Sequence, residues 1–389
     1  MIRRVPILQT MLRRGWSLLV VIGFLLHGAA RAAEGPRRLT PNDLRWLNRI
    51  TYGLDTATVE RYRMLGRKRF LAEQLHPAGL TLPADLSEPR DSARRPLSEV
   101  LAEVQAEQQR IQGLPTDDAK QQARQAHNQA ANQAASQAAR QHLLRALWSP
   151  AQVQAQMEGF WLNHFSVFQG KANLRWMVGD FEARALRPHA LGHFRDLLMA
   201  TVTHPAMLVY LDNAQSAVGR INENYARELL ELHTLGVDGG YTQQDVQELA
   251  RVLTGLGVHS GKEPRLKPAW QALYLRRDAF EFNPARHDFG EKTLLDQRIE
   301  GSGFSEVEQV VDLLARHPAT ARFLSRKLAT WWLGGEAPQA LVDSMARTFQ
   351  RSEGDIPAVL EVLFASRAFQ DSLGPVSYTH LTLPTKRIV

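Results

Sequence analysis

The segment NENYARELLELHTLG, residues 222–236, does most to decide the fold class. Its residues Tyr225, Leu229 and Leu232 recur every three or four positions, which is the spacing of the buried face of an α-helix. Gly236 follows the last apolar positions, where glycine commonly ends a helix. The segment therefore predicts an amphipathic helix whose core face holds Tyr225, Leu229 and Leu232.

Helical spacing recurs along most of the chain on both sides of this segment. A helix start is indicated at Thr40, where a threonine cap is followed by a proline and, at the third position, by Asp43. Between about residues 265 and 303 the pattern changes to short alternating runs, which predicts a small β-hairpin or irregular insertion. We therefore expect one all-α, multi-helix globular domain over residues 40–373. Its predicted helices cover 150–168, 173–186, 189–203, 222–235, 242–256, 305–315, 318–333, 338–350 and 355–369.

Residues 98–146 differ in composition from the rest, because Ala, Gln and Arg dominate them. Ala and Gln favour helix, but the segment has few large apolar residues and is interrupted around Gly113. It predicts a solvated helical arm or a partly ordered insertion. A surface hairpin of two helices is favoured over a partner-binding coiled coil, because no apolar heptad is sustained.

The N-terminal segment has the three parts of a secretory signal. Basic residues precede the apolar run Trp16–Leu26, and Ala30-Arg31-Ala32 matches the small residues around a cleavage site. The apolar run is shorter than the roughly 20 residues of a membrane-spanning helix. We therefore expect a signal peptide at residues 1–32, an exported protein in the periplasm or outside the cell, and no stable membrane span after cleavage. An uncleaved N-terminal anchor is the alternative.

The other end of the chain, residues 375–389, has no apolar period and looks like a translated adapter sequence. We treat it as a probable non-native tail and expect the native chain to be truncated here. The net charge is +7, but five positive charges lie in residues 1–32 and two in this tail, with no acidic residue in either. The remaining chain is about neutral, so no nucleic-acid partner is expected. The absence of cysteine excludes thiol nucleophiles and thiolate metal sites.

The polar face of the 222–236 helix contains the first candidate site. Glu228 and Glu231 are like charges three positions apart, which repel unless a cation or a proton lies between them. Arg227 can pair with Glu231 one turn away. This arrangement can act as a general acid and base or hold a divalent cation. The alternative is a structural network in which Arg227 bridges both acids.

Two histidines and two further acids extend this candidate site. His164 follows an aromatic stripe and His287 lies in the insertion, and either can transfer a proton or serve as a ligand. Oxygens of Asp212 and Glu223, together with Glu228, can line a pocket for a hard cation such as a divalent ion. No phosphate-binding loop, nucleophile elbow or dinucleotide fingerprint is present in the sequence.

Several blocks of this sequence resemble a bacterial family called domain of unknown function 1800. They include residues 204–213, 222–236, 250–255 and 287–292, and the resemblance covers residues 40–373. It implies an exported, mainly helical protein of unassigned activity. Members are often encoded beside an exported family that resembles sulfatases. The resemblance places His164, Arg227, Glu228, Glu231 and His287 on motif positions.

Two functions remain open on the sequence alone. One is a hydrolase that acts on envelope or extracellular polymers through the Glu, Arg and His residues. The other is a non-catalytic binding or assembly protein that works with an exported, sulfatase-like partner. Convergence of Glu228, Glu231, His164 and His287 on an open pocket would favour the enzyme, whereas dispersed or buried ion-paired groups would favour the binding protein.

Overall fold

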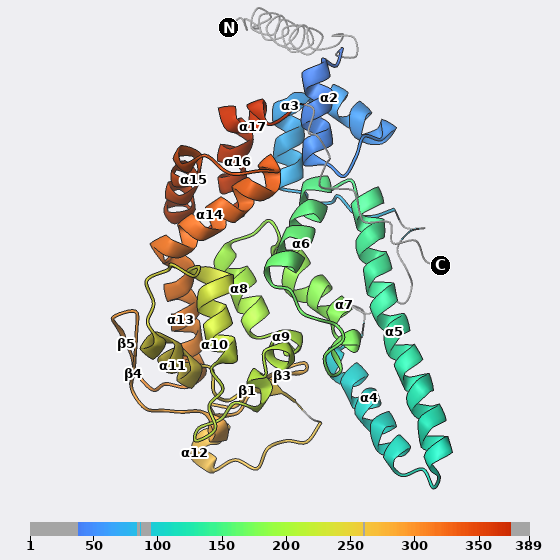
Figure 1. Cartoon of the computed structure of the whole chain (residues 1–389), viewed down its shortest axis with the longest axis vertical. Helices are drawn as coiled ribbons and strands as arrows, with labels where there is room; N and C mark the ends of the chain where they lie inside the picture. Colours follow the sequence, from blue (N-terminus) through green and yellow to red (C-terminus); the bar gives the residue numbers. More distant parts are fainter. Residues whose placement is uncertain (1–37, 84–85, 87–94, 260, 375–389) are drawn as a thin grey trace, which may run out of the picture.

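The computed structural model describes residues 38–83, 86, 95–259 and 261–374 (Figure 1). The predicted signal peptide at 1–32 and the predicted tail at 375–389 lie outside the described residues. Helices dominate the described chain, and the strands are short and antiparallel. The prediction of an all-α fold with a small β insertion is therefore confirmed.

The chain enters the described fold through α2 (Pro41–Ile50) and α3 (Thr56–Leu75). The capping box predicted at Thr40 is present, because the Asp43 amide donates to the Thr40 hydroxyl and the Asp43 carboxylate accepts from the Thr40 amide. Gly66, with φ of 70°, interrupts α3. The Arg49 guanidinium donates to the carbonyls of Trp332 and Leu333 and so fixes α2 to the end of a later helix.

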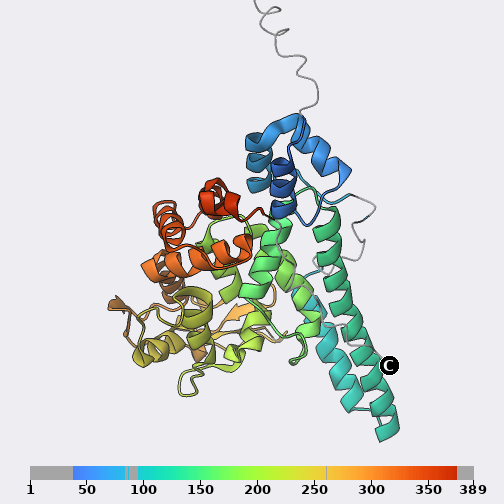
Figure 2. The ribbon, with the colours of Figure 1, turned by 45° about the horizontal axis from the view of Figure 1, so that its top comes forward.

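Residues 97–148 form a long helical hairpin along one side of the body (Figures 1 and 2). It consists of α4 (Leu97–Gln112) and α5 (Asp117–Trp148). The small side chains Ala131, Ala135 and Ala138 form the buried stripe of α5, which packs on η2 (Leu174–Trp176) and α7 (Val178–Asp180). Because the alanine side chains are small, the α5 backbone can lie close to the body.

The central helices contain two π-helical segments that the sequence did not predict. These are η3 (Phe181–Leu186) and η6 (Leu229–Thr234), which directly continues α10 (Asn224–Glu228). The wider turn rotates the following side chains, so Leu232 is 46% exposed whereas Tyr225 and Leu229 are buried. The predicted core position of Leu232 is therefore wrong. The other central helices are α6 (Gln152–His164), η4 (Arg187–His189), α8 (Phe194–Val202), α9 (Pro205–Tyr210) and α11 (Gln243–Val252).

The β insertion consists of two small antiparallel sheets. The first has the order β1 (Leu256–Val258), β3 (Phe280–Phe282), β2 (Leu275–Arg277), with Leu256 paired with Phe282 and Leu275 paired with Phe282 on its other side. The second pairs β4 (Lys292–Leu294) with β5 (Gln297–Ile299). The strands begin earlier than predicted, because Gly255 has a φ of 84° and ends the helical region before Leu256. The insertion also contains α12 (Pro268–Gln271) and η7 (Pro284–Arg286).

A C-terminal group of helices completes the core (orange to red in Figure 1). Its members are α13 (Phe304–Arg316), α14 (Pro318–Leu333), α15 (Gln339–Arg351), α16 (Ile356–Ala365) and α17 (Arg367–Asp371). α15 packs on both α14 and α16. Gly334 ends α14 in the left-handed conformation, with a φ of 72° that favours glycine.

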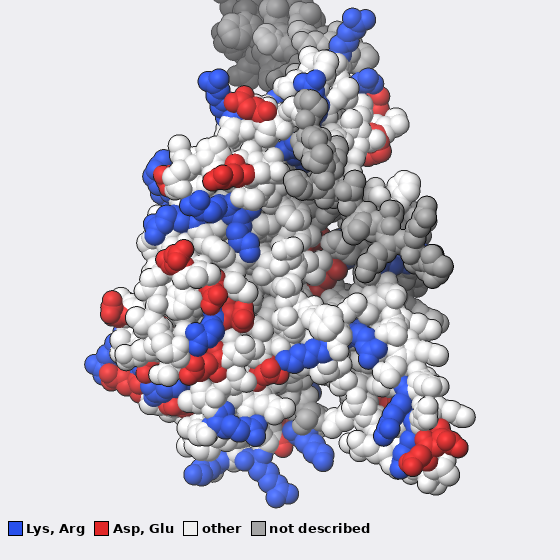
Figure 3. Space-filling model, in the orientation of Figure 1, with Lys and Arg blue, Asp and Glu red and all other residues white. Residues whose placement is uncertain are grey.

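Among the described residues, no helix has the length and apolar character needed to cross a membrane. Charged side chains of both signs are interspersed over the face of the molecule shown in Figure 3.

The packing of α5 on the body can be tested with two alanines of the same helix. Ala135 is buried and Ala139 is exposed. Ala135→Leu should lower the free energy of unfolding by about 1–3 kcal/mol because the larger side chain overfills the contact. Ala139→Leu should change it by less than about 0.5 kcal/mol. Urea unfolding of both variants measures the difference, and equal stabilities would contradict the described packing.

Candidate functional site

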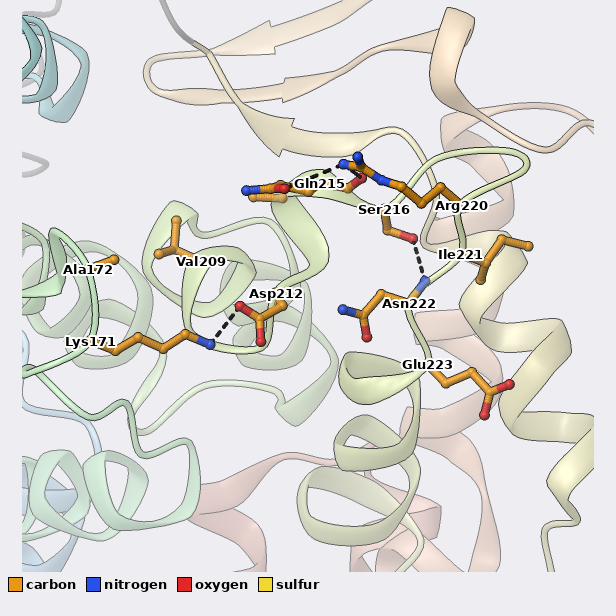
Figure 4. Close-up of a pocket in the computed structure, with 11 residues that line it drawn as sticks. Lys171, Ala172, Val209, Asp212, Gln215, Ser216, Arg220, Ile221, Asn222 and Glu223 are labelled. Atoms are coloured by element: carbon orange, nitrogen blue, oxygen red, sulfur yellow. Dashed lines mark hydrogen bonds and ion pairs between the residues drawn. The ribbon is translucent and has the colours of Figure 1, made fainter.

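An open pocket of about 700 Å³ lies between the end of α9 and the start of α10 (Figure 4). Lys171 and Asp212 lie on one side of it and form an ion pair of 2.7 Å. Asn222 and Glu223 lie on the other side, and Arg220 lies beside Gln215. The pocket therefore brings together the two predicted acids Asp212 and Glu223, which are separated by a loop in the sequence.

The loop of the pocket is held from behind by Arg286, which belongs to η7 of the β insertion. Its guanidinium donates to the backbone carbonyls of Ala214 at 2.8 Å and Ser216 at 3.0 Å. The Ser216 hydroxyl in turn accepts a hydrogen bond from the Asn222 amide at 3.2 Å. The buried Asn213 side chain donates to the Leu253 carbonyl at 3.0 Å. Hydrogen bonds to neighbouring elements therefore fix the loop that lines the pocket.

Glu223, which lines the pocket, belongs to a small network of polar side chains at the start of α10. The Arg227 guanidinium lies 3.4 Å from one Glu223 oxygen and donates to the Gln243 side chain at 2.9 Å. The Gln243 amide donates to the same Glu223 oxygen at 2.8 Å. Arg227 therefore pairs with Glu223 on the preceding turn, and not with Glu231 as the sequence suggested. The reason is that the helix changes to π geometry between Arg227 and Glu231.

Glu228 and Glu231 lie on α10 and η6 and do not line the pocket. Burial and the neighbouring Glu231 raise the pKa of Glu228, and Arg227 opposes this shift. Glu231 accepts a hydrogen bond of 3.3 Å from the Tyr241 hydroxyl. The two acids therefore form a half-buried pair away from the pocket, in which the charge of Glu231 opposes the ionisation of Glu228.

His164 is buried at the end of α6 and has a partner on each ring nitrogen. Nε2 donates to the His233 carbonyl at 3.1 Å, and Nδ1 accepts from the Lys327 amine at 2.8 Å. Burial and the charges of Lys327 and His233 hold the pKa of His164 well below its ordinary value. The ring is also enclosed by Phe160 and Phe165. The structure places His164 in the core as a neutral hydrogen-bonding group.

His287 is buried between the insertion and α13. Nδ1 lies 2.8 Å from the Thr254 carbonyl, and Nε2 lies 2.8 Å from a Glu306 oxygen. The other Glu306 oxygen accepts from the Lys292 amine at 2.5 Å. Burial would raise the pKa of Glu306, but hydrogen bonds from His287 and Lys292 outweigh it and lower that pKa. His287 therefore takes part in a buried charge network and does not reach the pocket.

A second buried charge network, which the sequence did not predict, joins the arm to the body. His142 and Arg145 of α5 both donate to Glu182 of η3, and Arg145 also donates to Glu158 of α6 at 3.1 Å. Arg187 lies 3.4 Å from Glu158. No sequence signal pointed to this network, because its pairs are 13 to 40 positions apart.

The same network contains the one group of possible metal ligands found among the described residues. Ligand atoms of His142, Glu158 and Glu182 lie within 4.8 Å of one another. Arg145 donates to both carboxylates, so a guanidinium already supplies the positive charge that this pair of acids needs. The predicted metal ligands Asp212, Glu223 and Glu228 do not form such a group.

Two carboxylates compete for Arg145 in this network, and their pKa values diverge. Burial raises the pKa of Glu158 to about 7 despite the nearby Arg145 and Arg187. Burial alone would also raise the pKa of Glu182, but the hydrogen bond from His142 and the charge of Arg145 lower it. Glu182 therefore carries the negative charge, and Glu158 exchanges a proton near neutral pH.

The fold and the pocket define a mainly helical protein with a supported polar pocket and with buried charge networks around Glu306 and Arg145. The chain belongs to the family described as protein of unknown function (DUF1800), whose profile matches residues 45–389. Comparisons with curated proteins and with solved structures found no match. The foreign origin of residues 375–389 stays a prediction.

Because the pKa of Glu158 is raised, the free energy of unfolding should depend on pH. The folded-state value of about 7 exceeds the ordinary value of 4.5, so the protonated form is favoured by folding. The contribution of Glu158 to the free energy of unfolding is fully present below pH 4.5 and is lost as the pH rises through 7. At about 1.4 kcal/mol per pKa unit, the loss is at most roughly 3 kcal/mol.

Replacement Glu158→Gln should remove this part of the pH dependence, because an amide does not ionise. The measurement is the midpoint of urea unfolding between pH 4.5 and 8 for the wild type and the variant. Glu361→Gln, at an exposed position of α16, is the matched control and should follow the wild type. Parallel curves for wild type and Glu158→Gln would show that the assignment is wrong.

The buried position of His287 predicts a structural rather than a catalytic effect of its replacement. His287→Gln leaves Glu306 buried without one of its two side-chain partners, which should cost about 3–5 kcal/mol of stability. His76→Gln, at an exposed position, should cost less than about 0.5 kcal/mol. Urea unfolding checks both values, and an unchanged stability of His287→Gln would contradict the network.

Proposed function

We propose that this chain is an exported binding protein whose pocket between α9 and α10 takes a hydroxyl-rich polymer of the cell envelope or the extracellular medium. The single observation that carries the proposal is the pocket of about 700 Å³, whose lining combines charged and amide side chains with apolar residues such as Val209 and Ile221. This volume lies within the range of about 300–1,000 Å³ that is typical of ligand sites.

The chemistry of the lining favours sugar hydroxyls over an apolar ligand. A hydroxyl group both donates and accepts hydrogen bonds, so it is matched by a wall that offers both kinds of partner. Lys171 and Arg220 donate, Asp212 and Glu223 accept, and Asn222 does both. Arg286 fixes the backbone of the loop at Ala214 and Ser216, which reduces the loop motion that a ligand would have to arrest.

The turn that contains the pocket residue Lys171 also carries an exposed aromatic residue. Phe168 is 66% exposed, and its carbonyl accepts a hydrogen bond of 3.1 Å from the amide of Lys171. The turn that supplies Lys171 therefore also presents Phe168 to solvent. An exposed aromatic ring on the same turn as a pocket residue offers an apolar face against which a sugar ring can pack.

The remaining parts of the proposal come from the sequence. The predicted signal peptide at residues 1–32 supports export, with the periplasm or the extracellular space as the place of action. An exported, sulfatase-like protein partner stays a prediction of the family resemblance.

Hydrolysis of the same polymer is the second candidate, and it is favoured by the position of two carboxylates. Asp212 and Glu223 both line the pocket, and a pair of carboxylates is the usual machinery of glycosidic-bond hydrolysis. This pair differs from the predicted set of Glu228, Glu231 and His164, which lie outside the pocket.

Binding to insoluble polysaccharide from bacterial envelopes, measured by co-sedimentation of the purified chain, tests the proposal. Asp212→Asn and Asn222→Ala should each weaken binding about tenfold or more, because each removes a polar contact worth roughly 1.5 kcal/mol. Asp118→Asn, at an exposed position of the arm, is the control for lost charge and should bind like the wild type.

The same samples distinguish binding from hydrolysis. New reducing ends that disappear in Asp212→Asn and Glu223→Gln would establish the second candidate. Binding that all pocket variants retain, or binding only to protein or peptide material, would refute the proposed function.

A further inference from the structure

The charges around the pocket are not balanced equally on its two sides. Lys171 and Asp212 neutralise each other at 2.7 Å. Glu223 is neutralised from outside the pocket by Arg227, at 3.4 Å. Of the four charged side chains that line the pocket, only Arg220 has no oppositely charged group within ion-pair distance among the described residues.

Arg220 is exposed and oriented by neutral groups alone. Its guanidinium donates to the backbone carbonyl of Gln215 at 3.2 Å and lies 3.4 Å from the side-chain oxygen of the same residue (Figure 4). These two contacts use one terminal nitrogen. The remaining N–H groups of the planar guanidinium are available to a ligand with two suitably spaced oxygens.

A second guanidinium strengthens the positive character of this wall. Burial lowers the pKa of Arg286, and repulsion from Arg220 adds to that effect, while Glu281 opposes it. Glu281 also accepts a hydrogen bond of 3.0 Å from Tyr274 and lies 3.2 Å from His259. Glu281, the acid that opposes the charge of Arg286, is therefore already engaged by other groups, and the Arg286 guanidinium adds positive charge behind the loop.

We infer that Arg220 forms a subsite for an anionic substituent, a carboxylate or a sulfate ester, so that the ligand is an acidic rather than a neutral polysaccharide. The inference rests on the proposed function and names the substrate class of the same pocket. Both substituents present oxygens in the spacing that a guanidinium binds with two parallel hydrogen bonds. The Lys171 side cannot perform this role equally well, because Asp212 already compensates its charge.

The test uses three oligosaccharides of equal length: a neutral one, one with uronic carboxylates and one with sulfate esters. Isothermal titration with the purified full chain should show about 5- to 10-fold tighter binding of at least one acidic ligand, since an exposed charge pair contributes up to about 1 kcal/mol and a charge-assisted hydrogen bond somewhat more. High salt should reduce this preference by screening.

Two variants at Arg220 separate charge from geometry. Arg220→Gln should bind the acidic and neutral ligands equally, and Arg220→Lys should keep part of the preference because it retains the charge without the planar fork. Arg347→Gln, at an exposed position of α15, is the matched control and should keep the full preference. Thermal unfolding of each variant verifies that all are folded, as expected for an exposed side chain.

The outcomes for the inference and for the proposed function are distinct. Equal binding of neutral and acidic ligands by the wild type, or an undiminished preference in Arg220→Gln, would overturn the inference and leave polysaccharide binding intact. Failure of all three oligosaccharides to bind would remove both.

Discussion

The carboxylate of Glu306 joins the helical body to the β insertion, and the position of the pocket depends on it. One of its oxygens accepts from His287 and from the amides of Ser302 and Gly303, and the other accepts from Lys292. A buried carboxylate is tolerated only with such partners. Because Arg286 precedes His287 in the chain, the network that fixes His287 also fixes the arginine that holds the pocket loop.

The sequence predicted those parts of the fold that depend on local patterns. The helix cap predicted at Thr40 is present as a capping box, the helix predicted from residue 242 begins at Gln243, and the change of pattern after residue 265 corresponds to antiparallel strands. The π-helical turn at Leu229–Thr234 was not predictable in this way. A helical period of 3.6 residues is an assumption in such reasoning, and packing of the surrounding helices overrides it at Leu232.

In the candidate site too, contacts between residues close in the sequence were predictable, whereas contacts between distant residues were not. Asp212 and Glu223 were singled out because their oxygens flank one short loop, and both line the pocket. The environments of His164 and His287 depend on partners far along the chain, Lys327 and Glu306, which no motif connects to them. Sequence spacing therefore identified polar residues with specific roles. It could not distinguish a residue that faces solvent from one that is buried in a charge network.

In the α4–α5 hairpin, the length of the helices is much greater than the length that packs on the core. α5 has 32 residues, which corresponds to about 48 Å at 1.5 Å per residue, and its buried side chains begin only at Ala131. About 20 Å of helix thus precedes the first turn that contributes to the core. Removing about seven residues, or two turns, from each helix would keep the angular phase of the hairpin. The reach of the arm can, however, change only as far as Gln108 of α4, whose side chain donates to Asn173 at 3.1 Å next to the pocket residue Ala172.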